Sequence, residues 1–426
     1  MTAYSTSLSC AKELDQTDPL ASYRNRFFLP EKSDGEPCTY LCGNSLGLQP
    51  KTARALVEQE LDDWARLGVD AHFRAKHPWM PYHELLTEQT ARLVGARPVE
   101  VVVMNTLTVN LHLMLVSFYR PTRTRYKILM EGKAFPSDQY AIQSQVRLHG
   151  HEPESAIIEV SPREGETHLR TEDILDRIER EGDAIALVML GGVNYYTGQF
   201  LDLQTITVTG QARGCVVGFD LAHAAGNVEL NLHDWNVDFA VWCSYKYLNG
   251  GPGCIAGCFV HENHATKTDL QRFAGWWGHD KRTRFQMPDQ FAAIPGAEGW
   301  QLSNPPILSL AALRASMDIF DEVGMTRLRE KSERLTGYLE FLLQQECSDF
   351  VKILTPELPD IRGCQLSIRF STRGKQFFDE LKKQDFICDW REPDVIRVAP
   401  VPLYNTYSDV YRFVEVLGDL DHDYKD

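Results

Sequence analysis

Two residues of this chain, a lysine and an aspartate that each follow an apolar run, are well placed to do chemistry. Lys246 lies in FAVWCSYKYLNGGPG, between a run of β-strand type and a glycine-rich turn, and Asp220 ends a similar run in GCVVGFDLAHAAGN. A carboxylate can keep a pyridine nitrogen protonated so that the ring accepts electrons, and a lysine can carry an aldehyde cofactor as a Schiff base. Either residue alone would be a weak signal. Together they predict a pyridoxal phosphate enzyme.

Two further segments could hold such a cofactor. The run EVVVM leads through Asn105 into the apolar helix VNLHLMLVSF, with Thr106 and Thr108 at its start. A helix N-terminus with free hydroxyl groups suits a phosphate, although the threonines could equally just cap the helix. The run YKILME ends at GKAFPSD, where Phe135 could stack on a flat ring or join the core. Asp138 could cap the next helix or contact that ring.

Three more side chains could complete the site. His223 could orient the carboxylate of Asp220, or be a buried histidine without a catalytic part. Tyr245 could bind phosphate or move a proton, or only pack. Arg397 interrupts the apolar run VIRVAPVPLYN. Its guanidinium suits a carboxylate bidentately, but an internal salt bridge would also satisfy it.

The elements that must position these residues alternate between strands and helices. Strands are indicated by EVVVMN, YKILME, AIIEV, AIALVML, CVVGFD, FAVWCSY and CIAGCFV, and helices by residues 51–67, 108–118, 138–149 and 171–181. This pattern predicts an α/β fold with a mostly parallel seven-stranded sheet covered on both faces. Ligands bind such sheets at the carboxyl ends of the strands, where Asp220 and Lys246 fall.

The chain is expected to divide into three parts. Residues 1–50 are predicted to form an N-terminal arm and a segment of a small domain, and residues 51–310 a large cofactor-binding α/β domain. Residues 311–426 contain a long helix around LREKSERLTGYLEFLLQQ, the run GCQLSIRFS, a helix at 375–384 and the run VIRVAPVPLYN. These are predicted to form a smaller α+β domain.

Composition limits the partners. A formal net charge of -15 argues against nucleic acid and an anionic membrane surface. The longest apolar stretch, 184–193, is too short to span a bilayer. The N-terminus resembles neither a secretory signal nor a mitochondrial presequence, so we expect a cytoplasmic protein.

Ten cysteines in a chain of this size favour reduced thiols over a disulfide set. Cys38 with Cys42, and Cys254 with Cys258, are loosely spaced and lack paired histidines. The sequence therefore predicts no metal site.

Longer motifs are spread over residues 20–420: YLCGNSLGLQP, AFPSDQYAI, GVNYYTGQ, GFDLAHAAGNVEL, WCSYKYLNGGPG, GWWGH, SNPPIL and IRVAPVPLYN. Together they resemble the kynureninase family, in the form found in animals and fungi. The resemblance implies fold type I of the pyridoxal phosphate enzymes and a homodimer with active sites shared across the interface. It also implies hydrolysis of the Cβ–Cγ bond of L-kynurenine or 3-hydroxy-L-kynurenine, giving anthranilate or 3-hydroxyanthranilate plus L-alanine. This reaction of tryptophan catabolism and NAD biosynthesis would pass through aldimine, quinonoid and ketimine intermediates.

Position by position, the resemblance implies that Lys246 forms the Schiff base, Asp220 contacts the pyridine nitrogen and Tyr245 acts as acid or base. The implied cofactor contacts are Leu107, Thr108, Phe135, Pro136, Ser137, Asp138, Asp220, His223, Tyr245, Lys246, Trp276 and Asn304. Trp276 and Asn304 are expected to reach across from the second subunit. Arg397 is expected to hold the substrate carboxylate, with His72, Ser303 and Asn304 near its aromatic ring. Gly191 stands where animal members are expected to have serine, so that contact would be absent or supplied by backbone.

Two other readings remain. One is another fold type I activity, such as a cysteine desulfurase or an aminotransferase. A desulfurase needs a reactive cysteine on a mobile loop, and none of the ten lies in an obvious one. The other is a non-catalytic scaffold, against which the presence of both Lys246 and Asp220 argues. The sequence does not decide between kynurenine and its 3-hydroxy form.

Overall fold

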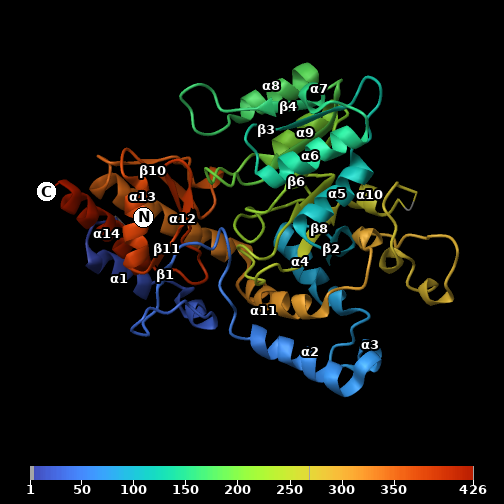
Figure 1. Cartoon of the computed structure of the whole chain (residues 1–426), viewed down its shortest axis with the longest axis horizontal. Coiled ribbons are helices and arrows are strands. Elements are labelled where there is room, and N and C mark those ends of the chain that lie inside the picture. Colours follow the sequence, from blue (N-terminus) through green and yellow to red (C-terminus); the bar gives the residue numbers. More distant parts are fainter. Residues whose placement is uncertain (1–3, 268, 426) are drawn as a thin grey trace.

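The computed structural model describes residues 4–267 and 269–425, and the chain forms two parts that lie side by side (Figure 1). The larger part is built on a seven-stranded sheet and the smaller on a four-stranded sheet. Both ends of the chain lie on the smaller part.

The large sheet has the order β2-β8-β7-β6-β5-β3-β4. Its strands are β2 (Val101–Met104), β3 (Lys127–Glu131), β4 (Ile157–Val160), β5 (Ile185–Gly191), β6 (Val216–Asp220), β7 (Phe239–Trp242) and β8 (Ala256–Val260). Only β8 runs against its neighbours β2 and β7. All seven predicted strands are present, and the predicted mostly parallel α/β fold is confirmed.

One strand boundary was predicted wrongly. β7 ends at Trp242, whereas the apolar run FAVWCSY predicted a strand up to Tyr245. The carbonyl groups of Ser244 and Tyr245 accept hydrogen bonds from Gly250 and Gly47, at 2.8 Å each, instead of from a neighbouring strand. Lys246 therefore lies in a loop beyond the sheet and not at the end of a strand.

Helices cover both faces of the sheet because alternate strand residues point in opposite directions. Ile128 and Met130 of β3 belong to one core cluster, together with α5 (Leu107–Phe118) and α6 (Pro136–Leu148). Leu129 between them belongs to another, together with α8 (Thr171–Glu181) and α9 (Leu203–Ala212). A strand buried on both faces needs the unbroken apolar sequence that these segments have.

The smaller part combines an antiparallel sheet, of order β12-β13-β10-β9, with three helices and the N-terminal arm. Its strands are β9 (Val351–Ile353), β10 (Leu366–Phe370), β12 (Asp389–Arg391) and β13 (Val395–Val398). Its helices are α12 (Met325–Glu346), α13 (Gly374–Lys383) and α14 (Tyr407–Lys425), against which α1 (Leu8–Gln16) packs. From the arm, β1 (Thr39–Tyr40) pairs in parallel with β11 (Phe386–Ile387). None of the helices in the described ranges combines the length and hydropathy that a bilayer crossing requires.

Helix α2 (Ala53–Leu67) forms where it was predicted, and acids rather than some of its large apolar side chains lie on its inner face. Leu61 and Trp64 are 41% and 61% exposed, while Glu60 and Asp63 are buried. The carboxylate of Glu60 accepts hydrogen bonds from Trp79 Nε1 at 2.8 Å and from the Tyr82 hydroxyl at 3.0 Å. Because hydrogen-bonded acids hold the inner face, the apolar stripe of α2 is left on the surface.

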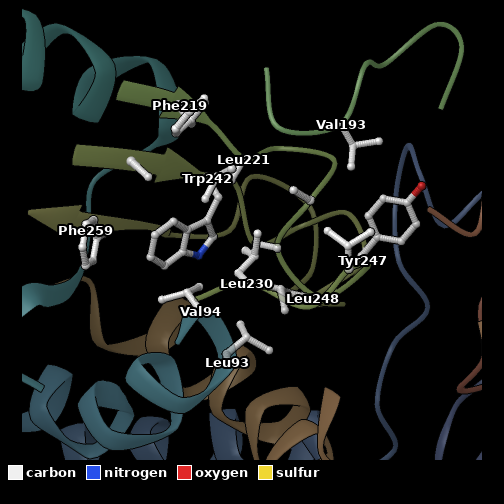
Figure 2. Packing of buried hydrophobic residues seen from close by; sticks show 14 of the residues in the cluster. Leu93, Val94, Val193, Phe219, Leu221, Leu230, Trp242, Tyr247, Leu248 and Phe259 are labelled. Carbon is white, nitrogen blue, oxygen red and sulfur yellow. The ribbon is translucent and has the colours of Figure 1, made fainter. Parts of the chain in front are cut away.

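The loop that carries Lys246 rests on an apolar core. Trp242, Tyr247 and Leu248 belong to one core cluster with Leu93 and Val94, and Figure 2 shows the indole of Trp242 beside Val94. Gly257 lies opposite Trp242 in the β7–β8 pair, and a Cβ atom there would lie 2.1–2.4 Å from the indole ring. The absence of a side chain at residue 257 therefore lets Trp242 lie flat beneath the loop.

We expect Gly257→Ala to destabilise the protein by about 1–3 kcal/mol, because Trp242 must move to admit the methyl group. Urea unfolding measures this change. Gly418→Ala is the matched control, since Gly418 lies in α14 with no atom within 4 Å of its added Cβ. That variant should be more stable by about 1 kcal/mol. Equal effects of the two substitutions would contradict this account.

Candidate active site

The carboxyl ends of six strands lie at one edge of the large sheet, because every strand except β8 runs in the same direction. A pocket lies at this edge. The predicted residues that line it are Leu107, Thr108, Phe135, Ser137, Asp138, Asp220, His223, Tyr245 and Lys246. Glu131, Val193, Tyr195 and Ala222 also line it, as does Gly191. Pro136, the first residue of α6, is not among the lining residues.

Lys246 points into this pocket beside a histidine and two rings. Its Nζ donates a hydrogen bond to Nε2 of His223 at 3.0 Å and lies 5.8 Å from the ring centres of Phe135 and Tyr245. Burial, followed by the charges of Lys246 and nearby arginines, holds the pKa of His223 well below its usual range. His223 is therefore neutral and contacts Lys246; the hypothesis that it orients Asp220 does not match this geometry.

Two carboxyl groups face each other on the pocket floor. Asp220 ends β6 and accepts a hydrogen bond from the amide of Ala222 at 2.7 Å. Asp138 lies in the first turn of α6, whose N-cap is Phe135, so it contacts Asp220 instead of capping the helix. Burial raises the pKa of both carboxyls, and the neighbouring charge of Asp220 raises that of Asp138 further. Such a pair holds a proton between its members and favours a cation placed against it.

Two helix N-termini also meet at the pocket. α5 begins after Thr106, whose side chain makes no capping hydrogen bond, and α6 begins after Phe135. The hydroxyl groups of Thr108 and Ser137 share a hydrogen bond of 2.9 Å between these first turns. Unpaired amide groups and two hydroxyls at paired helix starts suit a phosphate dianion.

Phe135 contributes an aromatic ring to the pocket lining. It is 43% exposed and contacts the edge of Tyr195 with ring centres 5.3 Å apart, so it is not a core phenylalanine. An acid pair, a free aromatic face, a lysine and a phosphate cradle match the four ends of pyridoxal phosphate: pyridinium, ring, aldehyde and phosphate. The residues present fit that cofactor.

Arg397 lies on β13, and its side chain is only 1% exposed. The sequence left two partners open for its guanidinium: a ligand carboxylate or an internal salt bridge. Arg397 is not among the residues that line the pocket, but its Nη1 donates to the carbonyl of Tyr195, which does line it, at 2.7 Å. Its Nη2 donates to Asp389 and, at 3.1 Å, to Ser45, so the internal salt bridge exists. Its buried Nε has no partner, which leaves a donor for a further anion.

Four predicted site residues lie elsewhere. Trp276 is 41% exposed, with its indole Nε1 bonded to the carbonyl of Arg284 at 3.1 Å. Ser303 and Asn304 are exposed, and His72 bonds through Nδ1 to the carbonyl of Val69 at 3.0 Å. None of the four lines the Lys246 pocket of its own chain.

Glu131 is a pocket residue that the sequence analysis missed. It ends β3 as Asp220 ends β6, an acid after an apolar run, which is the signal that could have identified it. Asn194 Nδ2 donates to its carboxyl at 2.9 Å, and the amide of Gly191 also hydrogen-bonds to it. Burial raises the pKa of Glu131 to about 7. A Cβ at Gly191 would lie 2.9 Å from this carboxyl. The backbone amide of Gly191 therefore contacts Glu131 at the position where animal members of the family were expected to have a serine side chain.

Two groups of histidines and acids occur outside the pocket, and their ligand atoms are already engaged. Near His83, Lys281 bonds both Glu84 and Glu298, at 2.9 and 2.6 Å. In the second group, Glu100 accepts hydrogen bonds from the amides of Arg97 and Glu262, both at 2.8 Å, and contacts two histidines. Both arrangements are explained by hydrogen bonding without an ion.

Comparison with known proteins agrees with this geometry. The family model of the kynureninase C-terminal domain matches residues 328–417. The kynureninase of Koribacter versatilis is 63% identical over 97% of both chains, and that of Myxococcus xanthus is 62% identical over the same shares. Among solved structures, the cysteine desulfurase CsdA from Escherichia coli has a TM-score of 0.76 at 16% identity, over 94% of this chain and 98% of that one. A C-DES mutant with glycine covalently linked to its pyridoxal phosphate has a TM-score of 0.75 at 15% identity, over 89% and 96%. These structures show a shared fold only.

The raised pKa of Glu131 predicts a pH-dependent stability. The carboxyl titrates near 4.5 when unfolded and about 7 when folded, so within this window the folded protein holds a proton that the unfolded chain has lost. Stability rises with pH only where the unfolded state binds more protons. Glu131 therefore lowers the free energy of unfolding of the cofactor-free protein by about 3 kcal/mol as pH rises through the window.

We expect Glu131→Gln to remove this decline, as measured by urea unfolding below and above the window. Glu159→Gln, at an exposed glutamate of the neighbouring strand β4, is the control and should keep it. A Glu131→Gln protein with the wild-type pH slope would refute the assignment.

Proposed function

The chain belongs to the kynureninase family, and we propose that the pocket around Lys246 is where it carries out the family's reaction. It hydrolyses L-kynurenine to anthranilate and L-alanine with pyridoxal phosphate as cofactor. The observation that carries the activity is 63% identity over 97% of both chains with a kynureninase. The position of Lys246, Asp220 and the two helix starts in one pocket supports the site assignment.

Bound pyridoxal phosphate supplies an electron sink for the pair of electrons left at Cα. Asp220 would hold a proton at the ring nitrogen, with Asp138 sharing the charge behind it. Thr108 and Ser137 would hold the phosphate, and Phe135 would lie against the ring. Lys246 would carry the cofactor and later move the Cα proton, and neutral His223 orients its Nζ by accepting a hydrogen bond.

The substrate is bound by its carboxylate at Arg397, whose unpartnered Nε faces no other acceptor. In the hydrolytic step the oxygen of water adds to the aryl ketone carbon, and the Cβ–Cγ bond breaks with its electron pair on Cβ. Cγ leaves as the carboxyl carbon of anthranilate, and Cβ takes a proton to become the methyl group of alanine. Burial raises the pKa of Tyr245 far above its usual value, so this phenol keeps its proton and is proposed as the acid. Both L-kynurenine and its 3-hydroxy form are proposed substrates.

The cysteine desulfurase alternative is not supported by the thiols. Nine cysteines are buried and Cys42 is half-buried, and all ten are free. Burial raises the pKa of Cys42 to about 11 and of Cys254 to about 12. A persulfide-forming nucleophile must be an accessible thiolate.

We also propose the cytoplasm as the compartment, because free thiols persist where the surroundings are reducing. The division into 1–50, 51–310 and 311–426 remains a proposal. The core cluster that α1 forms with residues 335–420 supports a separate small domain, whereas Leu313, Met317 and Phe320 of α11 (Ile307–Val323) pack in the core of the large part.

We propose that two copies of the chain form a homodimer through the surface built by α2, α3 (Ala71–Arg74) and residues 270–291. These segments carry exposed apolar side chains: Leu61, Trp64, Val69, Phe73, Phe273, Trp276, Phe285, Met287 and Phe291. Lys281 ties the segment to the large part through Glu84 and Glu298. A fixed apolar surface of this kind is typical of a protein interface. It carries Trp276 and His72, which would complete the partner's pocket.

Lys246→Ala should abolish turnover of L-kynurenine, because the only primary amine proposed to carry the cofactor is removed. Borohydride treatment should then trap no cofactor on the protein, and the visible absorbance of the covalently held cofactor should be lost. Lys352→Ala, at an exposed lysine of β9, is the control and should behave as wild type. Normal turnover in the Lys246→Ala protein would sink the site assignment.

Trp64→Glu should shift the protein from dimer to monomer in sedimentation, since a charge would be buried at the interface. Turnover should fall with it, because His72 and Trp276 would no longer reach a partner's pocket. Val208→Glu is the matched control: Val208 is 60% exposed on α9, away from this surface, against 61% for Trp64. A dimeric, fully active Trp64→Glu protein would contradict the proposed interface.

A further inference from the structure

Arg397 shares its aspartate with a second arginine that has no assigned role. Nη2 of Arg391 donates to Oδ2 of Asp389 at 3.2 Å, and Arg397 donates to the same oxygen. The hydroxyl of Ser45 donates to this oxygen as well. The Nε atoms of both arginines are buried without a hydrogen-bond partner. One carboxylate thus holds two guanidinium groups, and each guanidinium keeps an N–H donor without a partner.

The pairing of β12 with β13 places the three charges together. Asp389 lies opposite Arg397 in the antiparallel register, and Arg391 lies two residues along β12. Side chains two apart on a strand share a face, and directly opposite residues are close neighbours. The sequence Asp-Trp-Arg on an edge strand beside Arg397 is therefore enough to build the group.

The group adjoins the Lys246 pocket through Arg397, whose Nη1 donates a hydrogen bond to the carbonyl of Tyr195, a residue that lines the pocket. Asp389, Arg391 and Arg397 are not themselves among the lining residues. The charges of Arg397 and Arg391 also both lower the pKa of His223 and that of the Tyr195 phenol, which line the pocket. Two positive charges and one negative charge leave one net positive charge next to the pocket. This charge would balance the single negative charge of a carboxylate.

We propose that Asp389 and Arg391 are positioning residues for the substrate carboxylate: Asp389 aligns the two guanidinium groups, and Arg391 restores the positive charge that Asp389 cancels. Without Arg391, the salt bridge of Arg397 with Asp389 would be neutral as a whole. A carboxylate would then gain hydrogen bonds but little net attraction. This inference deepens the proposed function and rests on it for the identity of the substrate.

The test compares two amines that differ only by a carboxylate, L-alanine and ethylamine, bound to the holoenzyme and followed by the change in cofactor absorbance. Arg391→Gln should lower the ratio of L-alanine to ethylamine affinity by roughly 10- to 100-fold, because it removes the net positive charge that attracts the carboxylate. Ethylamine affinity should stay at the wild-type value. The KM for L-kynurenine should rise by a similar factor, with a smaller change in kcat. Arg391→Lys, which keeps the charge, should recover most of the ratio.

Arg369→Gln is the matched control, because Arg369 forms an ion pair with Asp394 on the same small sheet, at 3.2 Å. It should leave the ratio unchanged. An unchanged ratio in Arg391→Gln, or an equal loss of affinity for both amines, would overturn the proposal, since the second outcome indicates a general structural role.

The Asp389→Asn variant distinguishes two roles for Asp389: aligning the two guanidinium groups, or competing with the substrate carboxylate for them. If Asp389 aligns the arginines, this variant lowers the ratio although the net charge rises. A raised ratio would mean that Asp389 only competes with the substrate, and would overturn its assigned role. If the wild type binds L-alanine selectively but does not hydrolyse L-kynurenine, the proposed function fails while the inference about carboxylate binding is still tested.

Discussion

Buried negative charge next to a single lysine is the constraint on which the site depends. Glu131, Asp138 and Asp220 all lie around the pocket floor, and burial raises the pKa of each. Lys246 is the nearest cation, and it faces neutral His223. Carboxyl groups in this position destabilise the empty fold. A protonated pyridine ring offsets that cost, so the same charges that weaken the empty protein favour the cofactor in its electron-accepting form.

The loop 42–47 connects Lys246 with Arg397. Ser45 hydrogen-bonds to Asp389 and Arg397 on the small sheet. Two residues later, the amide of Gly47 bonds the carbonyl of Tyr245 at 2.8 Å. A Cβ at Gly47 would lie 2.3 Å from the carbonyl oxygen of Lys246, so only glycine permits this approach. A backbone contact, encoded in the motif CGNSLG, thus helps to fix Lys246 relative to Arg397.

The sequence predicted what depends on local pattern. Unbroken apolar runs identified all seven strands of the large sheet, and strand direction then brought Thr108, Asp138, Asp220 and Lys246 to one edge. Properties that depend on tertiary context could not be predicted this way. The outward stripe of α2 follows from the acids buried beneath it, and the role of Arg391 follows from the register of two short strands. The partner of His223 depends on a loop that leaves the sheet three residues before the predicted strand end.

The pocket of one chain offers candidate groups for only half of a substrate. We propose that Lys246 serves the amine and that Arg397, beside the pocket wall, serves the carboxylate. His72, Ser303 and Asn304, the residues expected at the aryl ring, do not line the pocket. An amine and a carboxylate are common to all amino acid substrates. Selectivity for the aryl ketone would then reside in the exposed surface that carries Trp276 and His72. Because such a surface can act on a pocket only from a second copy, we propose that reaction specificity and dimerisation are one property of this chain.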